Sequence, residues 1–164
     1  MATVDRVSEA SQVAVIYGSM TEHETMARVG AMLTRFGVTY DETVISPHRS
    51  PRALLDWCAE LEPRGVDVVV AGGGVNASLA GIVASHVTMP VIGVPLRGGG
   101  VAGVDSLLAM TSMSAGVPVA CVGLDHSTNA AVLAVQILAV RDPGLRTQLA
   151  QFKETFEQAA VTQF

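Results

Sequence analysis

The sequence predicts an α/β domain of three layers, in which helices cover both faces of a parallel sheet. Three observations lead to this fold class: apolar, β-branched runs alternate with segments of helical periodicity, the runs are apolar on both sides, and Gly, Ser or Pro punctuates them. Such strands are typical of parallel sheets that are buried on both faces. With 164 residues, of which 49% are hydrophobic, the chain suits one domain over residues 1–164, with its core at about 13–140.

The first part of the chain predicts two strands and two helices. Residues 13–17 form an apolar strand, and the following apolar residues recur at helical spacing until Gly37, a residue type that commonly ends helices. A second strand is expected over about 39–45. Pro51 then opens the next helix at a position where its missing N–H costs nothing.

The second part of the chain continues the same alternation. Its predicted strands cover about 66–71, 90–94 and 118–122, and its predicted helices end near residue 86, begin near residue 105 and span 129–140. The last segment, 143–160, carries a row of apolar residues on one face and has no further strand to follow it. We therefore expect a C-terminal helical arm that packs on its own domain or on a neighbouring subunit.

The charge and the composition exclude several classes of partner. The net charge is −5, and Lys153 is the only lysine, so the chain lacks the basic clusters that bind nucleic acid. Its apolar runs are too short to span a membrane, and we expect a cytoplasmic protein. Cys58 and Cys121 show no metal or redox spacing and are expected to be reduced core thiols. The 16 glycines and only 4% aromatics favour close backbone packing and a homo-oligomer.

Candidate binding residues follow the first and third predicted strands. In open α/β sheets, ligands bind beyond the carboxyl ends of the strands, where loops and helix N-termini converge. Gly18 and Ser19 offer backbone N–H groups and a hydroxyl that suit a phosphate, although a tight strand-to-helix turn uses the same residue types. Gly72, Gly73 and Gly74 permit close approach of a ligand, but they match neither the dinucleotide-binding fingerprint nor the P-loop.

The sharpest chemical signal is the segment 46–51, which has the sequence Ser-Pro-His-Arg-Ser-Pro. It places His48 beside Arg49 on a loop stiffened by proline. Arginine binds phosphate through parallel hydrogen bonds and histidine can carry protons, although an exposed histidine in a turn is commonly inert. We expect His86 to be structural, and His23 and His126 to lie at the rim of a pocket. No pair of histidines or carboxylates has ligand spacing, so we expect no metal site.

Taken together, the loops resemble a known family. The segments that carry the resemblance are VAVIYGSMTEHETM, SPHRSP, AGGGVNASLAG, MPVIGVP, GVDSLL, SAGVPVACVG and NAAVLAVQIL, which extend from about residue 13 to residue 138. In order and spacing they resemble the PurE family, the carboxyaminoimidazole ribonucleotide mutases and aminoimidazole ribonucleotide carboxylases of purine biosynthesis. The resemblance implies a homo-octamer of flavodoxin-like subunits that uses neither a metal nor an organic cofactor.

The resemblance also implies a substrate and a catalytic residue. The substrate is a 5-phosphoribosyl aminoimidazole that bears a carboxylate, which leaves as carbon dioxide and is added again at a ring carbon. His48 matches the family's general acid–base residue, which moves the proton. Ser19, Ser46 and Arg49 match the positions that hold the phosphate.

Other matching positions surround the ribose and the carbon dioxide. Thr21 and Glu22 stand where the family has Ser and Asp, and that Asp binds the ribose hydroxyls. Gly72, Gly73 and Gly74 would line the carbon dioxide pocket. Because Glu22 is one methylene longer than Asp, its carboxylate is expected to move by roughly 1 Å unless the loop shifts.

Several pocket positions depart from the family's pattern. Ser78 replaces a second active-site histidine, Asn76 is polar where the family is small and apolar, and Arg97 with residues 98–100 replaces a Gln-Ser stretch. We include Asn76, Ser78 and Arg97 among the candidate substrate-binding residues. An enzyme that changed its substrate would keep its framework residues and change the residues of its pocket, because function lies in the site and not in the fold. The sequence shows this pattern.

The sequence leaves three functional hypotheses open. The first is the mutase of purine biosynthesis. The second is a diverged enzyme that acts on another ribonucleotide or base, by decarboxylation or by phosphoribosyl transfer to a purine or deazapurine, in the biosynthesis of a nucleoside natural product. The third is a nucleotide-binding protein without catalysis, which the presence of His48 disfavours because a binder has little need of that residue.

Overall fold

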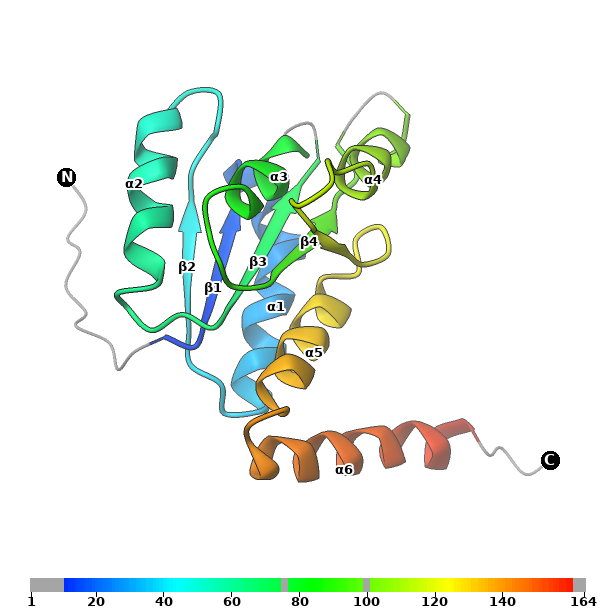
Figure 1. Cartoon of the computed structure of the whole chain (residues 1–164). Coiled ribbons are helices and arrows are strands. Elements are labelled where there is room, and N and C mark those ends of the chain that lie inside the picture. Colours follow the sequence, from blue (N-terminus) through cyan, green and yellow to red (C-terminus); the bar gives the residue numbers. More distant parts are fainter. Residues whose placement is uncertain (1–10, 75–76, 99–100, 161–164) are drawn as a thin grey trace.

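Five parallel strands form a single sheet in the order β2-β1-β3-β4-β5 (Figure 1). The computed structural model describes residues 11–74, 77–98 and 101–160. The strands are β1 (Val13–Tyr17), β2 (Tyr40–Val44), β3 (Val68–Gly73), β4 (Val91–Pro95) and β5 (Ala120–Cys121). This is the flavodoxin-like strand order, so the predicted three-layer fold with a parallel sheet is confirmed.

Helices cover both faces of the sheet. They are α1 (His23–Arg35), α2 (Pro51–Leu61), α3 (Ser78–Ala84), α4 (Val104–Thr111), α5 (Ser127–Leu138) and α6 (Pro143–Ala160), and a short 3₁₀ helix, η1 (Met20–Glu22), precedes α1. Val13, Val15 and Tyr17 of β1 join α1 and α5 in one core, while Ala14 and Ile16 join α2, α3 and α4 in the other. The alternation of side chains along a strand thus explains why β1 is apolar at every position.

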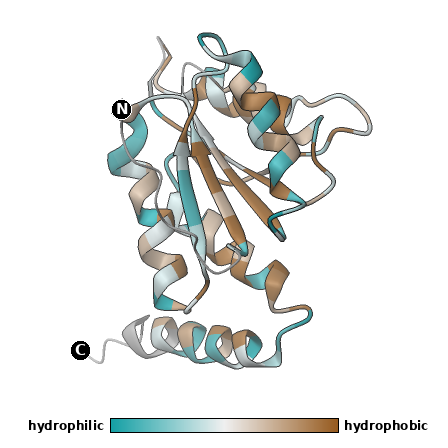
Figure 2. Cartoon of the chain, turned by 90° about the vertical axis from the view of Figure 1, so that its left-hand side faces the viewer, coloured by the Kyte–Doolittle hydropathy of each residue, from teal (hydrophilic) through white to brown (hydrophobic). Residues whose placement is uncertain are grey.

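Strand β2 corrects the expectation that the strands are apolar on both sides. It lies at the edge of the sheet, pairs only with β1 among the described strands, and none of its residues is fully buried. Figure 2 shows hydrophilic colour on this outer strand and brown on the inner strands. An edge strand needs less apolar surface because it has a neighbouring strand along one edge and is open to solvent along the other.

The predicted helix boundaries rest on local chemistry that the structure shows. Gly37 has a φ of +69°, a conformation that favours glycine, and it follows the end of α1. Pro51 is the first residue of α2. Ser19 caps η1, and its hydroxyl accepts a hydrogen bond from the backbone N–H of Thr21 at 3.4 Å. No helix in these described parts is long and apolar enough to cross a membrane.

Helix α6 packs on the rest of the same chain through its first half (Figure 1). Leu145 and Leu149 are buried in the core that contains α1 and α5. Phe152 meets the ring of Phe36 edge to face, with 5.3 Å between the ring centroids. Phe156 is 57% exposed. The apolar face predicted for this segment therefore anchors the start of the helix on the domain.

Candidate active site

Two pockets lie where β1 ends, at the carboxyl end of the sheet. One, which we call the Arg49 pocket, has a volume of about 420 Å³ and is lined by Gly18, Val44, Ile45, Ser46, Arg49, Ser50 and Ala53. The other, the Arg97 pocket, has a volume of about 370 Å³ and is lined by Ser19, Thr21, Glu22, Thr25, Leu96, Arg97 and Gly98. Because Gly18 lines one pocket and Ser19 the other, the two pockets flank the first turn after β1.

A tight turn between β2 and α2 shapes the Arg49 pocket. The backbone N–H of Ser50 donates to the carbonyl of Ser46 at 2.9 Å, and the N–H of Arg49 donates to the Ser46 hydroxyl at 3.4 Å. The turn places one guanidinium and two serine side chains around the same space. Donors of this kind suit an anion such as a phosphate, to which arginine forms charge-assisted hydrogen bonds.

His48 lies in the same turn, at residues 47–49, and its side chain is exposed. It does not line either of the two pockets, so the structure brings Ser46 and Arg49 together with Gly18 but leaves His48 beside them. Catalytic hydrogen bonds are often absent from ligand-free structures and form only with substrate. The assignment of His48 as the proton carrier thus rests on the resemblance.

Glu22 links the ends of two strands. Its Oε2 accepts hydrogen bonds from the backbone N–H of Gly18 at 2.9 Å and of Ser19 at 3.1 Å. Its Oε1 accepts one from the backbone N–H of Gly74, also at 2.9 Å. The longer side chain of glutamate therefore spans from the turn after β1 to the glycine segment after β3. A Cβ atom at position 74 would lie 3.2 Å from the carbonyl oxygen of Leu96. Glycine at this position therefore lets the segment after β3 pass close to the backbone at the end of β4.

Asp125 holds Arg97 in place at the second pocket. The Arg97 Nε lies 3.2 Å from one Asp125 carboxylate oxygen, and the Arg97 backbone N–H donates to the other at 3.0 Å. Asp125 has a φ of +59°, which an aspartate tolerates better than most residues. The Arg97 side chain is 69% exposed and lines the same pocket as Glu22. An arginine fixed at one edge in this way can bind a substrate anion with its other edge.

The remaining predicted residues are less closely gathered. Gly72 and Gly73 end β3 and are buried, and Gly72 pairs with Tyr17 of β1. Ser78 is the exposed first residue of α3 and lines neither pocket. Asn76 lies outside the described residues, as do Gly99 and Gly100. Thr25, in the first turn of α1, lines the Arg97 pocket and was not predicted, because no motif in the sequence singled it out.

The other histidines and the cysteines lie outside the pockets. His86 bonds within its own helix end, to Ser85 and to the carbonyl of Ile82. His23, expected at the rim, is not among the lining residues of the two pockets and contacts Tyr17 and Glu42. Burial raises the pKa of the Cys58 thiol to about 11 and that of Cys121 in the same direction, which suits reduced core thiols. Within the described ranges, no group of three His, Cys, Asp or Glu side chains has metal-site geometry.

The chain is similar to named enzymes over most of its length. It is 38% identical over 151 residues to the N5-carboxyaminoimidazole ribonucleotide mutase of Pyrococcus horikoshii, with 92% of this chain and 85% of the relative covered. It is 41% identical over 143 residues to the enzyme of the same name from Saccharolobus solfataricus, with 87% and 90% covered. It is also 39% identical to the phosphoribosylaminoimidazole carboxylase of Candida albicans, of which it covers only 26%.

The solved structures agree on the fold. PurE of Treponema denticola matches with a TM-score of 0.81 over 90% of this chain and 92% of its own, at 23% identity, which shows the fold alone. The model of the AIR carboxylase family matches residues 12–159. With a family match of this extent and relatives above 30% identity, the chain belongs to the AIR carboxylase family.

Proposed function

We propose that this chain is an N5-carboxyaminoimidazole ribonucleotide mutase. The observation that carries the proposal is the pair of pockets on either side of the Gly18–Ser19 turn, each lined by an arginine. A carboxylated ribonucleotide has two anionic groups, a phosphate and a carboxylate, and so needs two such places. The relatives named above carry this activity or the related carboxylase activity in their names, and they favour it over a diverged enzyme of natural-product biosynthesis.

The phosphate is assigned to the Arg49 pocket. Ser46 and Arg49 line it, and Ser19 stands at its border with the neighbouring pocket. Thr21 and Glu22 face the ribose. The carboxylate and the carbon dioxide lie toward Gly72, Gly73 and Gly74, with Arg97 opposite and with Asn76 and Ser78 as further binding positions. No metal or organic cofactor takes part in this proposal.

The reaction moves one carboxyl group and one proton. The N–C bond of the carbamate breaks and releases carbon dioxide, and the amine nitrogen takes up a proton. The ring carbon then forms a C–C bond to the carbon dioxide and loses its own proton. His48 carries the proton between the ring carbon and the amine, a step that a positioned histidine accelerates by about 10²- to 10⁴-fold. Glu22 and Arg97 orient the substrate during the transfer.

We also propose that the chain folds as one domain over residues 1–164 and that eight copies assemble into a cytoplasmic homo-octamer. Large apolar side chains just before and along α4 are exposed, with Val101 at 60%, Val104 at 51% and Leu108 at 58%, and a neighbouring subunit would cover them. Light scattering on the purified protein tests the octamer, because it would give about eight times the mass of the 17.0 kDa chain. A monomeric mass would overturn this part.

The activity is tested with two substrates. Purified protein is supplied with N5-carboxyaminoimidazole ribonucleotide, or with aminoimidazole ribonucleotide plus bicarbonate, and the ring-carboxylated product is followed by its absorbance. We expect the rate of product formation from the N5-carboxylated substrate to be proportional to the enzyme concentration. Product from bicarbonate alone would instead make the chain a direct carboxylase. Absence of turnover with both substrates, together with tight binding of a different ribonucleotide, would favour the diverged enzyme.

The role of His48 is tested by the His48→Asn variant. Asparagine keeps a polar side chain of similar reach but cannot carry a proton at neutral pH, so turnover should fall by about 10²-fold or more. The matched control is His86→Asn, because His86 is also exposed and bonds to Ser85 and Ile82 at its own helix end. Equal activity of the two variants would contradict the assignment.

A further inference from the structure

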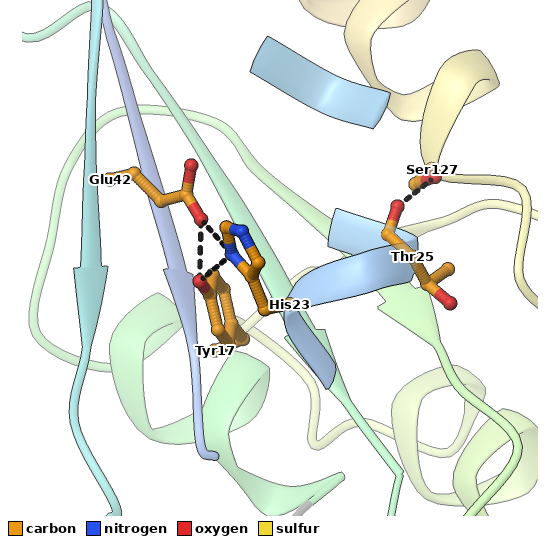
Figure 3. Close-up of polar contacts among 5 residues, drawn as sticks. All are labelled: Tyr17, His23, Thr25, Glu42 and Ser127. Atoms are coloured by element: carbon orange, nitrogen blue, oxygen red, sulfur yellow. Dashed lines mark hydrogen bonds and ion pairs between the residues drawn. The ribbon is translucent and has the colours of Figure 1, made fainter. Parts of the chain in front are cut away.

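A cluster of three polar side chains lies beside the pockets and is not used by the proposed reaction. Tyr17 ends β1, Glu42 lies on the edge strand β2, and His23 is the first residue of α1. The Tyr17 hydroxyl lies 2.7 Å from the Nδ1 atom of His23 and 2.5 Å from Oε1 of Glu42, and the Nδ1 atom lies 3.0 Å from the same oxygen. Figure 3 shows the three side chains pointing toward one another.

The distribution of protons in this cluster follows from its chemistry. Burial first, then the hydrogen bond to Glu42 and the negative charges of Glu42 and Glu22, raise the pKa of the Tyr17 phenol, so the phenol keeps its proton. That proton is donated to Glu42, which leaves the phenol oxygen as an acceptor. The Nδ1 atom of His23 faces two acceptors and therefore carries a hydrogen. The imidazole ring is thus held to the sheet edge through its Nδ1–H group.

The first turn of α1 is also held from its other side. The hydroxyl of Ser127, a fully buried residue at the start of α5, donates to the carbonyl of Thr25 at 2.7 Å (Figure 3). His23 and Thr25 therefore fasten the start of α1 to two different parts of the fold. Glu22 immediately precedes this fastened turn, and its carboxylate binds the N–H groups of Gly18, Ser19 and Gly74.

We propose that His23 is a positioning residue, which uses Tyr17 and Glu42 to hold the Glu22 carboxylate between the ends of β1 and β3. A free turn at the start of a helix frays readily, and a carboxylate on a long side chain has several rotamers. The cluster restricts both, so the Arg97 pocket keeps its shape before substrate arrives. The effect on turnover rests on the proposed function, whereas the effect on Glu22 does not.

The test compares His23→Ala with His23→Asn. Alanine removes the ring and its donor, whereas the side-chain amide of asparagine places an N–H close to the position of Nδ1 and should rescue the cluster. A second variant, Tyr17→Phe, removes one of the two acceptors without changing α1. The matched control is His86→Ala, which removes an exposed histidine that contacts neither Tyr17 nor Glu42.

The first readout is hydrogen exchange of the backbone amides in the protein without ligand. In His23→Ala, the amides of Gly18, Ser19 and Gly74 should exchange about tenfold faster, because Glu22 no longer holds them continuously. Amides inside β3 should keep their protection, which separates this local effect from global destabilisation. His23→Asn and His86→Ala should match the wild type, and Tyr17→Phe should fall between. Unchanged exchange at the three amides in His23→Ala would overturn the proposal.

The second readout is kinetic. A pocket whose shape is held less firmly binds both ground state and transition state less well, so KM for the ribonucleotide should rise about tenfold in His23→Ala while kcat changes less than about threefold. His23→Asn should restore KM. A fall in kcat with unchanged KM would overturn a positioning role. If the wild type has no turnover, the proposed function fails, but the exchange experiment still decides the role of His23.

Discussion

The carboxylate of Glu22 accepts a hydrogen bond from the backbone N–H of Gly74 at 2.9 Å, although the two residues lie 52 positions apart in the chain. The other oxygen of the same carboxylate binds the turn after β1. One side chain thereby bridges the ends of two paired strands that bound the proposed substrate site. A carboxylate can accept further hydrogen bonds, so these contacts are compatible with a ribose hydroxyl.

Shortening the Glu22 side chain should break its simultaneous contacts with the turn after β1 and with Gly74. In Glu22→Asp the carboxylate is withdrawn by about one C–C bond and can no longer reach both Gly18 and Gly74. We expect KM for the ribonucleotide to rise about tenfold in steady-state assays, because a displaced carboxylate keeps only part of its contacts with the substrate and with the two strand ends. Glu24→Asp is the matched control, since Glu24 is an exposed glutamate in the first turn of α1. An unchanged KM in Glu22→Asp would mean that the Gly74 contact does not shape the site.

Arg97 should bind an anionic part of the substrate. Removing the guanidinium in Arg97→Ala should raise KM about tenfold or more and weaken the dependence of KM on salt concentration, because the lost contact is between charges. Asp125→Asn keeps the shape at a position with positive φ but removes the charge facing Arg97, so we expect a smaller rise in KM. Arg141→Ala is the control, because Arg141 lies in a different pocket. If Arg97→Ala and Arg141→Ala behave alike, Arg97 does not contact the substrate.

The fold could be predicted from the sequence because its signals are local. The apolar run of β1, the glycine after α1 and the proline at the start of α2 each mark an element within a few residues, and all three lie where they were expected. The exposed side of β2 was not expected, since an edge position depends on the order of strands in space and not on the strand's own residues.

The site could be predicted only in part, for a related reason. Ser46 and Arg49 are neighbours in the sequence, and the turn that contains them brings both to one pocket. The contacts of Glu22 with Gly74 and of Arg97 with Asp125 join distant segments, and no periodicity announces them. The extra methylene of Glu22 was expected to displace its carboxylate relative to that of an aspartate, and the structure adds a contact with Gly74 that the sequence did not indicate.

The anchor of α6 can be tested on stability. Phe152 packs on Phe36, and the Arg35 guanidinium lies 4.8 Å from the centre of the Phe152 ring. Phe152→Ala should therefore lower the free energy of unfolding in urea by about 2 kcal/mol, less than for a fully buried phenylalanine. Phe156→Ala, one turn further along at a site that is 57% exposed, should cost less than about 0.5 kcal/mol in the single chain. Equal losses would indicate that another surface covers Phe156.

The Cys58 thiol should make stability depend on pH in the alkaline range. Cys58 is only 4% exposed, and burial raises its pKa from 9.0 to about 11. Between these values the unfolded chain loses the thiol proton while the folded chain keeps it, so the free energy of unfolding falls as the pH rises from 9 to 11. The titration of this one thiol lowers the free energy of unfolding by about 2 kcal/mol over that range, and this stability is fully present below pH 9. Urea unfolding of the wild type and of Cys58→Ala at several pH values isolates it, because Tyr17 and Cys121 titrate in both proteins. The stability difference between the two proteins should shrink as the pH rises, and a constant difference from pH 9 to 11 would show that the thiol titrates at its ordinary value.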